Sequence, residues 1–184
     1  QFVLYVQEGL DGTPRVLLDP NAWSDDGATA LAGYWPSEDG RRLAYLVQDS
    51  GSDWSTAKVL DVETGETLSD DIEWVKYSGL SWAKDGSGFF YSRYPAPGEG
   101  EAFQSLNHDH KVYFHRIGAP QSRDRLVYER PDRPEEGFAA EVSDDGEWLV
   151  VTVWKGTDER YEVVLLDLEN QNAPPVELVT GFEN

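Results

Sequence analysis

The chain has 184 residues, of which 35 are acidic and 15 basic, and its net charge is −20. This balance excludes the lysine- and arginine-rich surface that nucleic acids and anionic lipids require, so neither a nucleic acid nor a membrane is expected as a partner. No cysteine is present, which excludes disulfides and thiolate metal sites.

The first residues predict a β-hairpin. Phe2–Val6 and Arg15–Leu18 are apolar β-type runs separated by a glycine-containing turn. Asp19-Pro20-Asn21 ends the second run, because proline has no N–H to donate to a strand ladder. Ser24–Gly27 looks like another turn, and we interpret it as the loop into the first full repeat.

One type of turn then recurs three times along the chain. Asp39-Gly40, Asp85-Gly86 and Asp145-Gly146 each precede an apolar run, and their glycines are 46 and 60 residues apart. Asp-Gly suits a hairpin turn because glycine adopts positive φ without steric cost. A repeat of about 40–50 residues with several short strands is typical of a β-propeller, whose blades cannot bury their faces alone.

Each repeat contains four predicted strands. In chain order these strands are Ala30–Trp35, Leu43–Gln48, Lys58–Val62 and a short one near Thr67–Leu68, then Leu80–Trp82, Phe89–Ser92, Lys111–His115 and Arg125–Glu129, then Ala139–Val142, Trp148–Val153, Glu162–Leu168 and Val176–Val179. Pro95 to His110 is an insertion without periodicity in the middle repeat, and it accounts for much of the longer second interval.

The predicted fold is therefore all-β, a β-propeller fragment of about three and a half blades made of four-stranded antiparallel sheets. The whole chain, 1–184, is part of one propeller domain. Its parts are the outer strands of a preceding blade (1–20) and three blades (28–72, 78–130 and 138–180). Closure takes about four to eight blades, so we expect an open arc with unpaired edges at Phe2–Val6 and along the last blade.

Neither a catalytic residue nor a metal or other cofactor is predicted within the chain. The nearest approach to a hydrolase Gly-x-Ser-x-Gly elbow is Gly79–Ala83, which lacks the second glycine and falls in a predicted strand. His108, His110 and His115 supply zinc-ligand types, but we interpret this stretch as a polar loop that leads into a strand. Among so many carboxylates no pair stands out as a glycosidase pair.

Asp53 and Trp54 form the most informative loop. Gly51–Ser55 is a loop tip that carries a charge and a large aromatic ring. Such a tryptophan either covers the core or contacts a partner, and the residues themselves leave both interpretations open.

A set of motifs, in order along essentially the whole chain, resembles the propeller of prolyl oligopeptidases. The ordered series is specific, whereas a single Ser-x-Asp-Gly turn is weak evidence for a family. The motifs are Leu17–Asn21, Ser24–Gly27, Ser37–Gly40, Ser50–Trp54, Trp74–Ser78, Gly88–Pro95, His110–Gly118 with Gln121-Ser122, and Glu141–Gly146.

The resemblance implies a domain and not a whole enzyme. In this family a seven-bladed propeller caps an α/β-hydrolase domain, which supplies Ser, Asp and His and cleaves short peptides after proline through an acyl-enzyme. The propeller excludes folded proteins and lines part of the cavity. The resemblance implies that this chain is the part of the propeller that gates substrate entry and is itself non-catalytic. The implied partners are the hydrolase domain and short proline-containing peptides.

The resemblance also assigns roles to individual residues. It implies that Asp53, with Trp54, faces the hydrolase domain and contacts a basic residue there. Tyr77 takes the place of an aromatic residue on the S3 side of the substrate, and Thr157 takes another S3-side position, where the animal enzymes carry a thiol. The 98–110 insertion matches a propeller loop implicated in substrate entry, and it is shorter here.

Two other functions remain open at this point. One is a non-catalytic protein- or peptide-binding propeller similar to TolB, and the other is the propeller of a basic-residue-specific oligopeptidase. A propeller glycosidase is a weaker third interpretation. Because the chain begins at Gln1 and contains no methionine, we expect a piece of a longer, soluble protein, from the cytoplasm or the periplasm.

Overall fold

Strands follow the apolar runs along nearly the whole chain. The computed structural model describes residues 1–49, 52–98 and 107–182, and the elements it contains there are almost all β, as predicted. The strands are β1 (Leu4–Val6), β2 (Arg15–Leu18), β3 (Thr29–Pro36), β4 (Arg42–Asp49), β5 (Ser55–Asp61), β6 (Thr67–Trp82), β7 (Gly88–Arg93), β8 (Lys111–Arg116), β9 (Arg125–Tyr128), β10 (Glu136–Val142), β11 (Trp148–Lys155), β12 (Tyr161–Asp167) and β13 (Val176–Val179). Two short 3-10 helices, η1 (Pro20–Ala22) and η2 (Gln121–Arg123), lie between them.

The Asp-Gly turns close hairpins between neighbouring strands. In the turn between β3 and β4, the Ser37 hydroxyl donates to Asp39 at 2.7 Å, and the Gly40 N–H donates to the Ser37 carbonyl at 2.9 Å. Gly40 has φ of 68°, a conformation that glycine adopts without a Cβ clash. The turn at 143–146 repeats these bonds, so local side-chain chemistry determines where the chain reverses.

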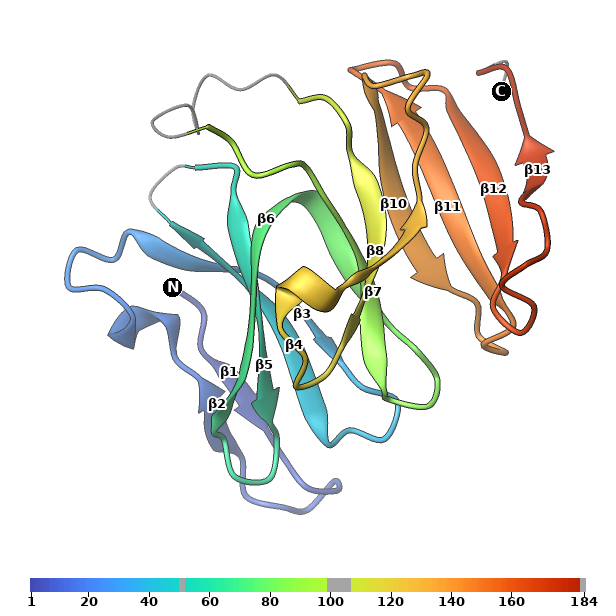
Figure 1. Cartoon of the computed structure of the whole chain (residues 1–184). Helices are drawn as coiled ribbons and strands as arrows, with labels where there is room; N and C mark the ends of the chain where they lie inside the picture. The colour runs from blue at the N-terminus through green and yellow to red at the C-terminus, as the bar shows by residue number, and fades with distance from the viewer. Residues whose placement is uncertain (50–51, 99–106, 183–184) are drawn as a thin grey trace.

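Strand β6 joins what the sequence predicted as two separate strands. The expected short strand near Thr67–Leu68 and the expected strand at Leu80–Trp82 are the two ends of one 16-residue element. Its first part pairs with β5 and its last part with β7, with a register shift between Val75 and Leu80. Figure 1 shows β6 in green, arching between the two groups of strands that it joins.

The strands of the described residues form three sheets. Strands β3 to β9 form one seven-stranded antiparallel sheet in sequential order, β10 to β13 form a four-stranded sheet, and β1 pairs with β2. The division into blades at 28–72, 78–130 and 138–180 stays a prediction, because β6 runs across the first boundary without a break in strand structure.

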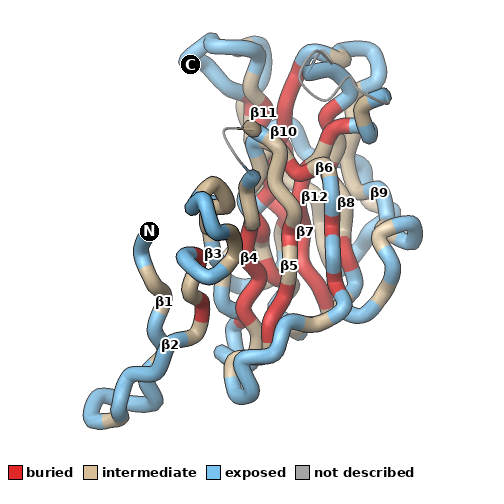
Figure 2. Tube along the Cα trace, turned by 90° about the vertical axis from the view of Figure 1, so that its left-hand side faces the viewer, coloured by how far each residue is buried: buried red, intermediate tan, exposed pale blue. Residues whose placement is uncertain are grey.

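The buried apolar side chains of the described chain form three clusters between the strands. One apolar cluster joins residues of β4 and β5, such as Val59, to Trp82 and Phe89. A second joins Phe90 and Val112 to the four-stranded sheet, and a third joins Leu18 of the hairpin to β4 and β5. In Figure 2 the buried residues run along β4, β5 and β7, whereas the β1–β2 hairpin is mostly exposed. Stacked sheets that cover one another's faces are the packing expected of a propeller.

Side-chain hydrogen bonds join the end of β6 to β3 and to β10. The indole N–H of Trp82, at the end of β6, donates to the Trp35 carbonyl of β3 at 2.9 Å. The hydroxyl of Ser81 accepts from the Val142 N–H of β10 at 2.9 Å. Ser81, the serine of the nearest Gly-x-Ser-x-Gly approximation, therefore makes a structural contact between strands.

A buried ion cluster links distant strands on the interior. His115 of β8 is fully buried, with its Nδ1 2.7 Å from Asp124 and its Nε2 2.9 Å from Asp70 of β6. Asp70 also accepts from the Gly118 N–H at 2.6 Å, and Asp124 accepts from the Tyr91 hydroxyl at 2.7 Å. Burial alone would lower the pKa of His115, but its hydrogen bonds to the two carboxylates outweigh burial and raise the pKa to about 9.

Strands β1 and β13 lie at sheet edges. Within the described residues, β1 pairs only with β2 and β13 only with β12. Val176 and Leu178 of β13 and Phe2 before β1 are exposed apolar side chains. The unpaired edges expected from the sequence are therefore present. No helix of the described chain is long and apolar enough to cross a membrane.

Candidate functional site

A cleft of about 790 Å³ brings together residues that lie far apart in the sequence. Tyr77 of β6 and Thr157, just after β11, both line it, and both side chains are exposed. The walls are aromatic and the rim is polar, and the other lining residues are Tyr94, Asn107, His108, Glu135, Trp154, Lys155 and Gly156. Apolar walls with a few polar groups are typical of a ligand-binding cleft.

Tyr77 projects into this cleft from a strained backbone. Its φ is 53°, within the left-handed region that bulky residues rarely adopt. The side chain is about half exposed, at 51%. Its hydroxyl lies 3.4 Å from a carboxylate oxygen of Asp53. Backbone strain of this kind gathers at ligand-binding sites.

Asp53 and Trp54 lie beside the cleft and contact its wall. The Lys76 ammonium is 3.6 Å from Asp53 and 5.0 Å from the ring centres of both Trp54 and Tyr77. Trp54 also packs edge-on against Tyr94 with ring centres 6.2 Å apart. This half-buried tryptophan therefore covers core residues, whereas the Asp53 side chain is 62% exposed and open to a further contact.

His110 supports the aromatic wall from within. It is buried, at 2% exposure, with its ring 4.3 Å from that of Tyr94 and 5.5 Å from that of Trp154. Its Nδ1 accepts from the Phe138 N–H at 2.9 Å, and its Nε2 lies 3.1 Å from the Lys76 carbonyl. Burial lowers the pKa of His110 to about 4, so the ring is neutral at pH 7.

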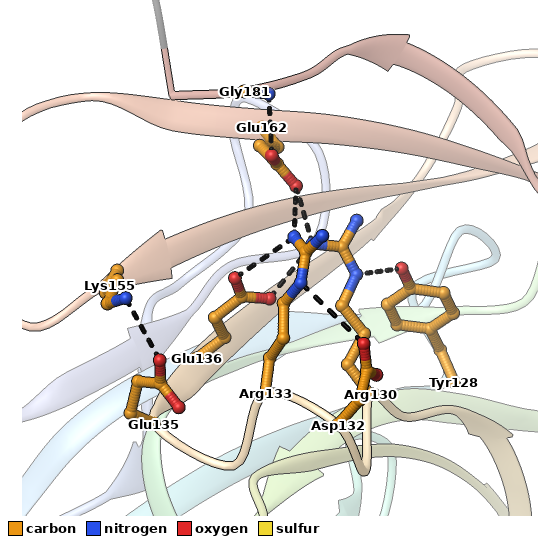
Figure 3. A network of polar contacts seen from close by, with 9 residues as sticks. All are labelled: Tyr128, Arg130, Asp132, Arg133, Glu135, Glu136, Lys155, Glu162 and Gly181. Atoms are coloured by element: carbon orange, nitrogen blue, oxygen red, sulfur yellow. Dashed lines mark hydrogen bonds and ion pairs between the residues drawn. The ribbon is translucent and has the colours of Figure 1, made fainter.

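A network of ion pairs borders the polar rim of the cleft (Figure 3). Lys155 pairs with Glu135 at 3.0 Å, and both line the cleft. Glu136, which follows Glu135 in the chain, pairs with Arg130 at 2.9 Å, and Arg130 also pairs with Glu162 at 2.5 Å. Two buried carboxylates thus anchor the start of β10 to β12.

The structure gathers all four predicted site residues around one cleft. Tyr77 and Thr157 line it, and Asp53 and Trp54 contact the residues of its wall. Most of the 98–110 insertion lies outside the described residues. Sequence reasoning missed Tyr94, Trp154 and His110. The motifs Gly88–Pro95 and His110–Gly118 contained Tyr94 and His110, but nothing local indicated that these rings lie together with Trp154 at one cleft.

A second depression, of about 800 Å³, lies between the N-terminal hairpin and the turns of β3–β6. Its lining includes Arg15, Asp39 and Glu63 and contains no aromatic residue. We favour the Tyr77 cleft as the functional site because it combines aromatic walls with a strained residue. Within 1–49, 52–98 and 107–182, no cluster of three or more His, Asp or Glu side chains could hold a metal ion.

The antiparallel sheets and the stacked core define a β-propeller fragment. The sequence matches the family model described as "Prolyl oligopeptidase, N-terminal beta-propeller domain" over residues 1–184. The chain therefore belongs to this family, which is the N-terminal propeller of a serine peptidase family.

Curated relatives are named as peptidases. The chain is 38% identical to the prolyl endopeptidase of Elizabethkingia meningoseptica over 184 residues, covering 100% of this chain and 26% of that protein. It is 31% identical over 173 residues to a dual function macrocyclase-peptidase of Galerina marginata, covering 88% of the chain and 24% of the relative. The chain thus spans about a quarter of the length of these relatives.

Solved structures that resemble this chain are also prolyl oligopeptidases. A prolyl endopeptidase structure matches with a TM-score of 0.80 and 42% identity, covering 92% of this chain and 23% of that one. Prolyl oligopeptidase B of Galerina marginata, bound to a 25mer macrocyclization substrate, matches with a TM-score of 0.85 and 27% identity over 98% of this chain and 28% of that one. In such relatives the propeller and the catalytic domain belong to one chain.

Proposed function

We propose that this chain is the substrate-gating propeller portion of a prolyl oligopeptidase-like serine peptidase that cleaves short peptides after proline. The observation that carries the proposal is the cleft that gathers Tyr77 and Thr157. Its aromatic walls suit the apolar side chains and proline rings of a short peptide. A hydrolase domain elsewhere in the parent protein supplies the nucleophile, and the chain by itself is non-catalytic.

The proposal gives Tyr77 a direct contact with the substrate. In the full-length parent, Tyr77→Ala should raise KM for a short proline-containing peptide by about tenfold, because loss of a central aromatic contact commonly exceeds 1 kcal/mol. The melting temperature should change little, because the side chain is half exposed. Steady-state kinetics with a fluorogenic peptide provide the measurement.

Tyr5→Ala serves as the matched control for this experiment. Tyr5 is similarly exposed, at 57%, but lies on β1 in the hairpin. An equal rise in KM for both variants, or none for Tyr77→Ala, would contradict the assignment of the cleft to substrate.

Asp53 is proposed to contact a basic residue of the hydrolase domain. Asp53→Ala in the parent should lower kcat/KM by up to about fivefold, the size of an exposed ion pair, through weaker domain docking. Asp71→Ala is the control, because Asp71 is a similarly exposed carboxylate, paired with Lys58, that does not line the cleft. Unchanged kinetics together with unchanged thermal unfolding of Asp53→Ala would refute the docking role.

A further inference from the structure

Hydrogen bonds hold the residues on both sides of Tyr77 in β6. On one side, the carbonyl oxygen of Lys76 lies 3.1 Å from the Nε2 atom of His110. On the other side, the Ser78 hydroxyl accepts from the Ser92 N–H of β7 at 2.8 Å and donates to the Gly79 carbonyl at 2.7 Å. A bulky residue keeps a φ of 53° only where its surroundings over-determine it.

The Lys76 carbonyl directly affects the strained torsion. The φ angle of Tyr77 is defined by the carbonyl carbon of Lys76 together with the N, Cα and C atoms of Tyr77. A hydrogen bond that fixes the plane of the Lys76–Tyr77 peptide therefore fixes one end of this torsion. His110 makes that hydrogen bond from 34 residues further along the chain.

The tautomer of His110 follows from its second contact. Its Nδ1 accepts from the Phe138 N–H of β10 at 2.9 Å, so that nitrogen carries no proton. In the neutral ring the single proton is then on Nε2, which donates to the Lys76 carbonyl. The packing of the ring against Tyr94 and Trp154 fixes its orientation.

We propose that His110 is a positioning residue that holds Tyr77 in its cleft-facing conformation. It does so by donating from Nε2 to the Lys76 carbonyl while β10 fixes its other nitrogen. The inference rests on the proposed function insofar as Tyr77 contacts the substrate. The positioning itself is a property of the backbone and can be measured separately.

Two variants of His110 separate positioning from packing. His110→Gln places an amide N–H close to the position of Nε2 and can keep the bond to Lys76. His110→Asn places an amide oxygen close to the position of Nδ1, so it can accept from Phe138 but leaves the Lys76 carbonyl unpaired. Both variants lose the aromatic ring, so they share the loss of packing.

In the full-length parent, His110→Asn should raise KM for a short proline-containing peptide by about fivefold relative to His110→Gln, the effect of losing one hydrogen bond. The kcat values of the two variants should agree. Amide hydrogen exchange in residues 77–79 should accelerate in His110→Asn and stay slow in His110→Gln. Equal exchange in the two variants would overturn the positioning role and leave His110 as a packing residue.

The exchange measurement also separates this inference from the proposed function. Faster exchange in His110→Asn alone supports positioning even if Tyr77→Ala leaves KM unchanged, an outcome that would remove only the substrate contact. Should both variants fail to fold, ¹⁵N NMR of the wild-type imidazole decides, with the ring identified by its coupling to the Phe138 amide. A proton on Nδ1 in place of Nε2 would overturn the proposal.

Discussion

Replacing His115 with leucine is expected to lower the free energy of unfolding by about 3–5 kcal/mol, the usual effect of removing one partner from a buried ion cluster. Asp70 and Asp124 would remain buried, and the cation between them would be gone. Urea unfolding of the parent protein, followed by tryptophan fluorescence, gives the measurement. The exposed His108 offers the control, because His108→Leu leaves no carboxylate unpaired.

Removal of the two carboxylates tests whether their loss of a buried cation causes the destabilisation. His115→Leu combined with Asp70→Asn and Asp124→Asn should recover part of the stability lost in the single variant, since no buried charge then lacks a partner. A triple variant that is less stable by the sum of three independent losses would show that packing, and not charge pairing, dominates at this position.

The same cluster predicts a pH dependence of stability. The pKa of His115 is raised from 6.5 to about 9 in the folded protein. Because the folded value is the higher one, the stabilisation is fully present below about pH 6.5 and is lost as the pH rises through about 9. Unfolding midpoints measured between these values should fall in the wild type and fall less in His115→Leu. Parallel slopes would contradict a charged His115.

Replacing Arg130 with methionine should also destabilise the protein by about 3–5 kcal/mol. Arg130 bridges Glu136 and Glu162, whose side chains are only 2% and 5% exposed. Its guanidinium, together with the Gly181 N–H, lowers the pKa of Glu162 against the effect of burial, which alone would raise it. Without Arg130 these carboxylates lose their closest cation in the network of Figure 3.

Arg133 provides a matched control from the same network. It reaches Glu136 at 3.5 Å and Glu162 at 3.8 Å, but its side chain is 48% exposed. Arg133→Met should therefore cost about 1 kcal/mol or less, as exposed ion pairs do. Equal losses for the two arginine variants in urea unfolding would refute the claim that burial determines the importance of Arg130.

The sequence predicted the strands well because turn chemistry is local. Asp39-Gly40 and Asp145-Gly146 form the turns expected of them, and the apolar runs that follow are strands. The continuous β6 was missed, because the strand continues through Trp74 and Tyr77 with positive φ in aromatic residues, and no sequence pattern indicates this.

Closeness in sequence did not predict the surroundings of the histidines. His110 and His115 were considered together as members of one polar cluster. In the structure each is buried in a different place, His110 against Phe138 and His115 between Asp70 and Asp124. These partners lie 9 to 45 residues away. Burial keeps the His110 ring neutral, whereas the two carboxylates outweigh burial and favour the charged form of His115.

By itself, the sequence determined the fold class, the hairpin turns and the family, because each depends on local residue order and a repeated spacing. The tertiary structure alone decided that Tyr94 and Trp154 line the same cleft as Tyr77 and Thr157. It also decided that His110 contacts the Lys76 carbonyl beside Tyr77 and that His115 and Arg130 are paired in the interior. Contacts between strands depend on register and stacking, which no local pattern specifies.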